Sequence, residues 1–145
     1  MNELQINKIL QRCPKTRGIF IKCAPADRMP IRDHYPYAAV FNTDKASRSG
    51  QHWVAIFVPS KDVVEYFDSY GDLPNIDIAS YLYLFPEVKR STQPLQSLFS
   101  NVCGQYCIYF VIQRCLGRRY EDIISLLRRL KDPDKYVAQF ALRSL

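Results

Sequence analysis

The chain has 145 residues, of which 48% are hydrophobic and 23% charged, and its 20 Lys and Arg against 14 Asp and Glu give a net charge of +6. This length favours one domain, residues 1–145, and the apolar content excludes a disordered chain. No apolar run approaches the ~20 residues of a membrane helix, and the polar start MNELQINKILQRC is unlike a secretion signal. These features predict an intracellular protein that is not secreted and has no membrane partner.

The predicted elements begin with a short helix at 3–12, where apolar residues recur at helical spacing before Pro14. Apolar and β-branched runs bounded by turn residues then predict four strands: 18–23, 37–42, 52–58 and 63–68. A helix at 76–86 and an irregular or strand-like piece at 87–97 follow. Three further helices complete the chain: 103–116, 119–130 and 133–143. This order predicts an α+β domain with a mostly antiparallel sheet, packed with a central buried helix and further helices.

The strands at 52–58 and 63–68 are joined by PSKD, which predicts a hairpin. With a loop of three or five residues, His52 falls opposite Asp68 on the same face, whereas Glu65 points to the other face. A loop with an even number of residues would place His52 and Asp68 on opposite faces of the hairpin. Opposed side chains have Cβ atoms ~4.5–5.5 Å apart, so the carboxylate could hold one nitrogen of the imidazole.

Cys103 lies in the stretch SNVCGQYCIYFV, at the predicted start of the buried helix. It can be a core thiol, part of a metal or disulfide pair with Cys107, or a nucleophile. Five cysteines in a chain without an export signal argue against a disulfide framework, and without a C-x-x-C pair or a nearby His no metal site is expected. A helix start lowers a thiol pKa. Gly104 would let a substrate backbone approach, and the Cys103 N–H and the Gln96 side-chain amide are candidate oxyanion donors.

Together, the segments GQHWVAIFV, EYFDSYG and PLQSLFSNVCGQYC resemble the three motifs of the adenovirus maturation proteinase (adenain) family. Similar enzymes occur in virophages and Maverick/Polinton-type elements, and the SUMO and other ubiquitin-like-protein proteases share the catalytic core. The resemblance implies a papain-like, adenain-like cysteine protease fold. It assigns the nucleophile to Cys103, the general base to His52, the orienting acid to Asp68 and the oxyanion side chain to Gln96. Trp53 resembles the aromatic residue that narrows the substrate channel.

The chain departs from the adenovirus enzymes in two ways. They usually carry a glutamate where this chain has Asp68, the choice of the ubiquitin-like-protein proteases. They also use a peptide cofactor that is disulfide-linked to a cysteine upstream of the nucleophile, and between Cys23 and Cys103 this chain has none. The same covalent activation is therefore not expected. The sequence requires no cofactor, and a DNA or peptide activator is left open.

The leading hypothesis is a monomeric cysteine endopeptidase that cleaves viral or transposon-encoded capsid precursors after small, Gly-type residues, in the infected host cell and the virion. A protease for ubiquitin-like proteins is the alternative within the same class. Two further alternatives are an acyltransferase with the same His-Asp-Cys core and a non-enzymatic basic interaction domain.

The basic residues are concentrated in three clusters, and these predict non-specific contact with DNA phosphates. A solvated basic face with cations at helix ends is the alternative. The residues concerned are Lys89, Arg90, Arg118, Arg119, Arg128, Arg129 and Lys131.

Overall fold

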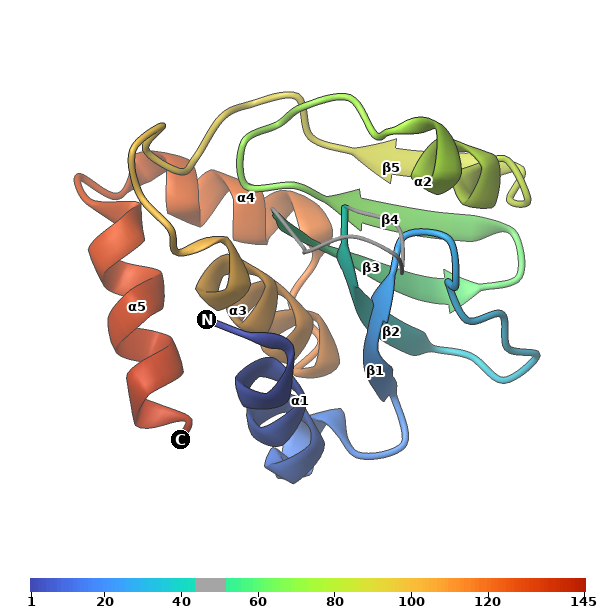
Figure 1. Ribbon diagram of the computed structural model, residues 1–145, viewed down its shortest axis with the longest axis horizontal. Coiled ribbons are helices and arrows are strands. Elements are labelled where there is room, and N and C mark those ends of the chain that lie inside the picture. Colours follow the sequence, from blue (N-terminus) through green and yellow to red (C-terminus); the bar gives the residue numbers. More distant parts are fainter. Residues whose placement is uncertain (44–51) are drawn as a thin grey trace.

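A five-stranded sheet with helices on both faces forms the protein, as shown by a computed structural model that describes residues 1–43 and 52–145 (Figure 1). The strands lie across the sheet in chain order: β1 (Phe20–Pro25), β2 (Tyr37–Asn42), β3 (Trp53–Ser60), β4 (Val63–Phe67) and β5 (Glu87–Arg90). The helices are α1 (Glu3–Arg12), α2 (Ile76–Leu82), α3 (Cys103–Cys115), α4 (Tyr120–Arg129) and α5 (Pro133–Arg143), with a short 3-10 helix, η1 (Pro14–Thr16). The predicted α+β class is confirmed.

The sheet is mixed. β3 pairs antiparallel with β2 and β4, whereas the outer pairs, β1 with β2 and β4 with β5, are parallel. The antiparallel pairing expected from the sequence is therefore confined to the centre of the sheet. A parallel neighbour requires the chain to return to the end where it started, and it does so through the loop 26–36 and through α2.

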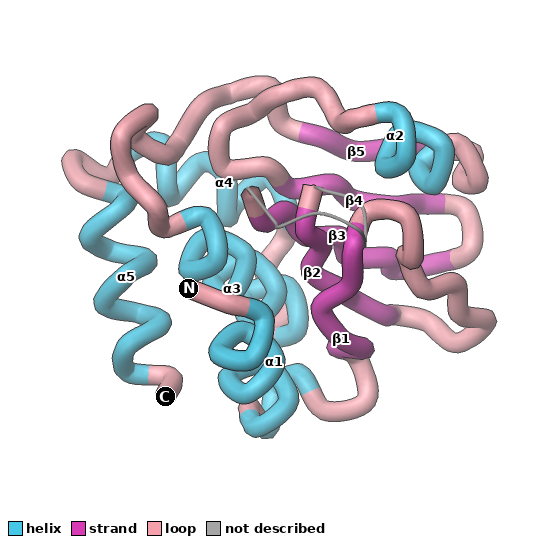
Figure 2. The backbone as a smooth tube through the Cα atoms, viewed as in Figure 1, coloured by secondary structure: helices cyan, strands magenta, loops and turns pink. Residues whose placement is uncertain are grey.

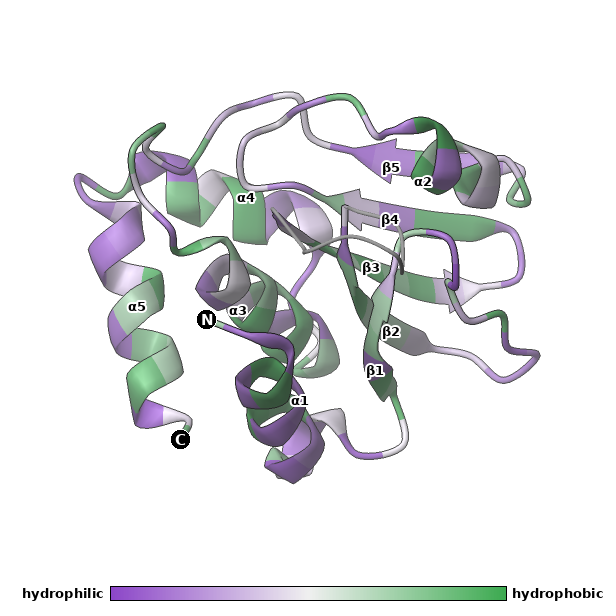
Figure 3. Ribbon diagram, in the orientation of Figure 1, coloured by the Kyte–Doolittle hydropathy of each residue, from purple (hydrophilic) through white to green (hydrophobic). Residues whose placement is uncertain are grey.

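The two faces of the sheet bury alternate residues of each strand, as expected for a period of two. On one face, Ala55, Phe57 and Phe67 pack against α3, and α1, α4 and α5 surround that helix. On the other face, Val54 and Ile56 belong to the cluster that α2 covers. Figure 3 colours α3 mainly hydrophobic and the edge strand β5 mainly hydrophilic. The predicted central buried helix is confirmed.

The β3–β4 hairpin has a different register from the one predicted. Ser60 pairs with Val63 across a two-residue turn, and such an even turn alone would place His52 and Asp68 on opposite faces. The register then shifts by one, so that Phe57 pairs with Glu65 and Ala55 with Phe67. β3 thus has one extra residue at 58–59, where a proline fits a bulge. This shift restores the parity that brings His52 and Asp68 to the same face.

Several element ends follow from local signals in the sequence. α1 begins after Asn2, whose side chain accepts from the Gln5 N–H at 2.9 Å while Gln5 Oε1 accepts from the Asn2 N–H, a capping box. α5 begins with Pro133 after the capping residue Asp132. The helix predicted at 76–86 ends earlier, at Leu82, because the chain turns there.

The bidentate pair between Arg114 and Glu65 joins the end of α3 to β4. Arg114 Nε lies 2.7 Å and its second terminal nitrogen 3.0 Å from the two Glu65 oxygens, and the Glu65 side chain is 4% exposed. Glu65 therefore points to the face of the sheet that α3 covers, as its pairing partner Phe57 does.

Replacing Arg114 with alanine would leave this buried carboxylate without its partner. We expect Arg114→Ala to lower the free energy of unfolding by about 3–5 kcal/mol, measured by urea denaturation. Arg119→Ala, which removes an exposed pair with Asp122, serves as the control and should change stability little. Equal effects of the two variants would contradict a special contribution from the buried pair.

Candidate active site

Three side chains predicted to act together meet at the end of the sheet where β3 begins and β4 ends. His52 precedes β3, Asp68 follows β4, and Cys103 is the first residue of α3, which packs against β3. His52 Nε2 lies 2.7 Å from Asp68 Oδ1, and these side chains are 15% and 4% exposed. His52 also hydrogen-bonds to Cys103.

The electrostatics of the pair favour the charged forms of both partners. Burial alone would lower the pKa of His52, but hydrogen bonds to Asp68 and Cys103 raise it to about 9. Burial alone would raise the pKa of Cys103, yet hydrogen bonds from His52 and from the backbone of Trp53 and Gly104 lower it. A thiolate beside an imidazolium is the nucleophilic form of such a pair.

The other cysteines with shifted pKa values differ from Cys103 in this respect. Burial raises the pKa of Cys115 to about 11 and also raises that of Cys23 and of Cys107. All five cysteines are free thiols. Cys107 is fully buried one turn into α3, as expected for an inert core thiol.

This contrast gives a test based on alkylation. Iodoacetamide should label Cys103 fastest, and its rate should rise with pH as the thiol ionises, with a midpoint below the ordinary pKa of 9.0. Below that midpoint the thiol is protonated and labelling should slow. Mass spectrometry of peptides labelled at a series of pH values measures this. Five uniformly slow cysteines would instead favour the non-enzymatic interpretation.

The first turn of α3 presents its backbone donors near the sulfur. Within the described part of the chain, no side chain caps this helix start at Val102. The N–H groups at a helix start lack intrahelical partners and carry a positive partial charge. They can therefore stabilise a thiolate, and the role of the Cys103 N–H as an oxyanion donor stays a prediction.

Gln96 lies in the loop before α3 and is 4% exposed. Its Oε1 accepts from the Ser69 hydroxyl at 2.6 Å, and its Nε2 donates to the Ser100 carbonyl at 3.2 Å. Figure 2 shows, in pink, the two long loops that carry Ser69 and Gln96, one leaving β4 and one entering α3. The amide is thus held in the segment leading to Cys103, and its role as an oxyanion donor stays a prediction.

Tyr70 is a further residue of the site that the sequence analysis missed. Its ring stacks on His52 with centroids 4.8 Å apart, and its N–H donates to Asp68 Oδ1 at 2.9 Å. Its hydroxyl donates to the Ser100 carbonyl at 3.2 Å. The signal available in the sequence was an aromatic residue two positions after the candidate acid.

Trp53 and Gly104 both contact the first residue of the chain. Trp53 Nε1 donates to the Met1 carbonyl at 3.2 Å. A Cβ at Gly104 would lie 3.2 Å from Met1 Cβ and 3.2 Å from Ile6 Cδ1. The close packing of α1 on α3 is thus one structural reason for glycine at this position, and its role in the approach of a substrate stays a prediction. The role of Trp53 in narrowing a substrate channel stays a prediction.

The basic residues predicted to bind DNA lie in two regions, a first region near the start of α4 and a second region at its end. The helix is about 15 Å long. Lys89 Nζ lies 2.7 Å from Glu121 Oε1, and Arg119 Nε lies 2.9 Å from Asp122 Oδ2, so acids partly neutralise the first region. DNA binding stays a prediction. The first region comprises Lys89, Arg90, Arg118 and Arg119, and the second comprises Arg128, Arg129 and Lys131.

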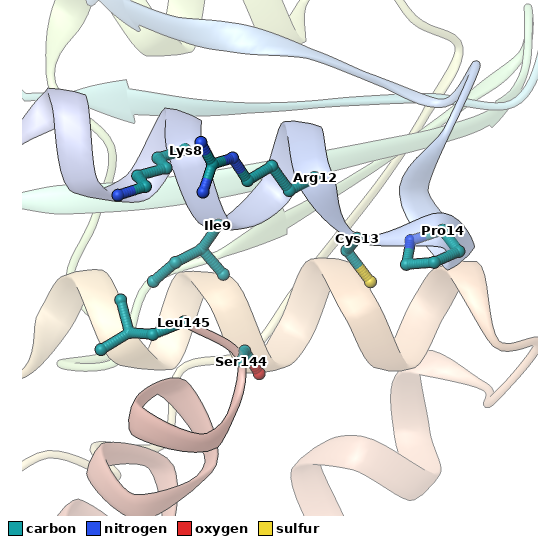
Figure 4. A pocket seen from close by; sticks show the side chains of 7 residues that line it. All are labelled: Lys8, Ile9, Arg12, Cys13, Pro14, Ser144 and Leu145. Carbon is teal, nitrogen blue, oxygen red and sulfur yellow. The ribbon is translucent and has the colours of Figure 1, made fainter.

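Two hollows are relevant to the location of the site. One, of about 390 Å³, opens on the acid side of the pair and is lined by Thr43, His52, Tyr66, Asp68, Tyr70, Asp72, Leu73 and Asn75. The other, of about 380 Å³, lies between α1 and the end of α5 and is lined by Lys8, Ile9, Arg12, Cys13, Pro14, Ser144 and Leu145 (Figure 4). No histidine or carboxylate side chain accompanies Cys13 in this lining, so it offers no catalytic pair.

Neither a metal centre nor a membrane span is found in residues 1–43 and 52–145. Nowhere in these residues do three or more His, Cys, Asp or Glu side chains gather in a way that could hold a metal ion. None of their helices combines the length and apolarity needed to cross a bilayer.

The domain has the fold of the papain-like, adenain-like cysteine proteases. In it, the central hairpin of the sheet holds a His-Asp pair next to a thiol at the start of a buried helix. No protein-family model matches the chain. Two crystal structures of the African swine fever virus protease superpose on 94% of it with TM-scores of 0.60 and 0.59 and 22% identity. They confirm the fold predicted from the motifs.

Relatives that match the sequence include proteins of two viruses. The SUMO-1 cysteine protease of African swine fever virus is 28% identical over 119 residues, which are 69% of this chain. A protein of Acanthamoeba polyphaga mimivirus that bears the name of a thiol protease is 26% identical over 99 residues. These matches confirm the resemblance to viral proteases of the adenain and SUMO-protease type. The chain spans only 41% and 33% of the length of these two relatives.

Proposed function

We propose that the protein is a cysteine endopeptidase. The observation that carries this proposal is the convergence of Cys103, His52 and Asp68, with a 2.7 Å contact between base and acid and a lowered pKa of the thiol. The similarity to viral cysteine proteases supports it.

The arrangement supports hydrolysis through a thioester. The Cys103 thiolate attacks the peptide carbonyl carbon, and the oxygen takes up the negative charge in reach of the Cys103 N–H and the Gln96 amide. The C–N bond then breaks, and the leaving amine takes a proton from the His52 imidazolium. His52 next draws a proton from water, whose oxygen attacks the thioester and releases the acid and the thiol. Asp68 holds the imidazole in orientation throughout.

The experiment is cleavage of peptides that vary in the two residues before the cut. If Trp53 narrows the channel, peptides with glycine or alanine there should be cleaved and those with bulky residues rejected. A preference for large residues would contradict this role of Trp53. Transfer of an acyl group to an added amine, with no hydrolysis, would favour the acyltransferase instead.

Capsid precursors of a virus or mobile element are the substrates we propose, processed in the infected cell and the virion. The viral origin of the relatives supports this choice. A protease for ubiquitin-like proteins is the second candidate, because one relative carries the name of a SUMO-1 protease. Recombinant capsid precursors and SUMO-1 with a short C-terminal extension, offered in parallel, separate the two. Cleavage of SUMO-1 alone would contradict the capsid proposal.

A further inference from the structure

The turn Asp68–Gly71 connects the candidate base to the loop before α3. Its ends are joined by a hydrogen bond from the Gly71 N–H to the Asp68 carbonyl, at 2.9 Å. Gly71 has a φ of +68°, and a Cβ there would lie 2.8 Å from the backbone of Thr92. Only glycine fits both the backbone conformation and this close approach. The turn is therefore fixed against the loop 91–102.

Ser69 is the part of this turn that contacts Gln96. It is 1% exposed, and its carbonyl accepts from the backbone N–H groups of Leu95 and Gln96 at 2.8 and 3.0 Å. Its hydroxyl reaches Gln96 Oε1 at 2.6 Å. The backbone and the side chain of Gln96 are thus both held by one residue.

The contacts also determine which way the Gln96 amide points. Its nitrogen faces the Ser100 carbonyl, which can only accept, so Oε1 must face Ser69 and the Ser69 hydroxyl must donate. The amide nitrogen carries two N–H groups, and in the described residues Ser100 accounts for one. The other is the N–H that the proposed oxyanion hole would use.

We propose that Ser69 is a positioning residue of the oxyanion hole. By holding Oε1 it fixes the Gln96 N–H in the direction of the developing charge. The inference rests on the proposed protease function. One turn would then orient the base, through Asp68 and Tyr70, and the oxyanion donor, through Ser69. Because preorganised donors contribute most of their effect through position, loss of the Ser69 hydroxyl should weaken catalysis without removing any group that contacts the substrate.

A double-mutant cycle tests this coupling. With a peptide substrate, Ser69→Ala should lower kcat about 10–100-fold and Gln96→Ala about 10²–10³-fold, with KM little changed. The double variant should be no slower than Gln96→Ala alone, because Ser69 acts only through Gln96. Multiplicative losses would overturn the proposal. Ser97→Ala, the same change at an exposed position of this loop, is the matched control and should keep kcat within about twofold, as for most surface substitutions.

Alkylation of Cys103 separates positioning from general damage. Iodoacetamide reacts at a saturated carbon and forms no oxyanion, so Ser69→Ala should leave the labelling rate and its pH midpoint unchanged. A parallel fall in labelling would show that Ser69 supports the Cys103–His52 pair or the fold, and would overturn the proposal.

A peptide aldehyde ending in glycine gives a readout that does not depend on turnover. The Cys103 sulfur bonds to the aldehyde carbon, and the carbonyl oxygen becomes a hydroxyl or oxyanion in the proposed hole. Its affinity should fall about 10–100-fold in Ser69→Ala and no further in the double variant than in Gln96→Ala. If the unaltered protein cleaves no peptide, the proposed function fails, while the aldehyde series still decides the role of Ser69. Equal aldehyde affinities, or no binding to the unaltered protein, would overturn it.

Discussion

Cys103→Ala is expected to lower kcat/KM for peptide hydrolysis on the order of 10⁶-fold, the scale found when a catalytic nucleophile or its base is removed. His52→Ala should have a similar effect, because the thiol would lose both its proton acceptor and the imidazolium that stabilises the thiolate. The fold should persist in both, since Cys103 and His52 are only partly buried. Hydrolysis of a glycine-containing peptide and circular dichroism spectra measure the two properties.

Cys13→Ala is the matched control, since Cys13 is a partly buried thiol that lines the hollow between α1 and α5. It should retain full activity. Substantial hydrolysis by Cys103→Ala, for example through Cys107, would disprove the assignment of the nucleophile.

Asp68→Asn should lower kcat/KM on the order of 10⁴-fold while preserving the size of the side chain. The amide removes the negative charge that stabilises the imidazolium and can hold the wrong tautomer of His52. The pKa of His52 should therefore fall from about 9, because the hydrogen bond to Asp68 is the strongest of the influences that raise it. Kinetics and an NMR titration of the imidazole measure both changes.

The midpoint of Cys103 alkylation should move to higher pH in the same variant, since its thiolate loses part of the imidazolium charge. Asp62→Asn, an exposed acid in the β3–β4 turn, is the control and should leave both midpoints in place. An unchanged His52 pKa in Asp68→Asn would show that Asp68 does not orient the base.

Elements with a strong local signal were predictable to the residue. α1, β2 and α5 have the bounds expected from apolar periodicity, capping residues and prolines. β1 begins at Phe20 rather than at Gly18 because Gly18 adopts a positive φ of 79° in the preceding turn. The meeting of Cys103, His52 and Asp68 was predictable only in part. The order of the three motifs indicates it, but the parity argument assumed an odd loop, and the bulge at 58–59 that restores the parity has no local signal beyond Pro59.

Features that depend on distant contacts were not predictable. Nothing local to Gly104 indicates that Met1 and Ile6 lie against it. The stacking of Tyr70 on His52 requires the turn after β4 to fold back over the strand start. The parallel outer strands likewise depend on how the crossover segments pack, which a pattern of alternating residues does not record.

The bulge at 58–59 has a consequence for how this hairpin can vary in length. If the bulge lost one residue, or the turn at 61–62 gained one, the side chains of one strand beyond that point would move to the other face of the sheet relative to the other strand. His52 would then point away from Asp68. Two such changes together would cancel. Among homologous chains, insertions and deletions within 58–62 should therefore occur in compensating pairs, while the loop 26–36, which sets no such parity between base and acid, can change by single residues.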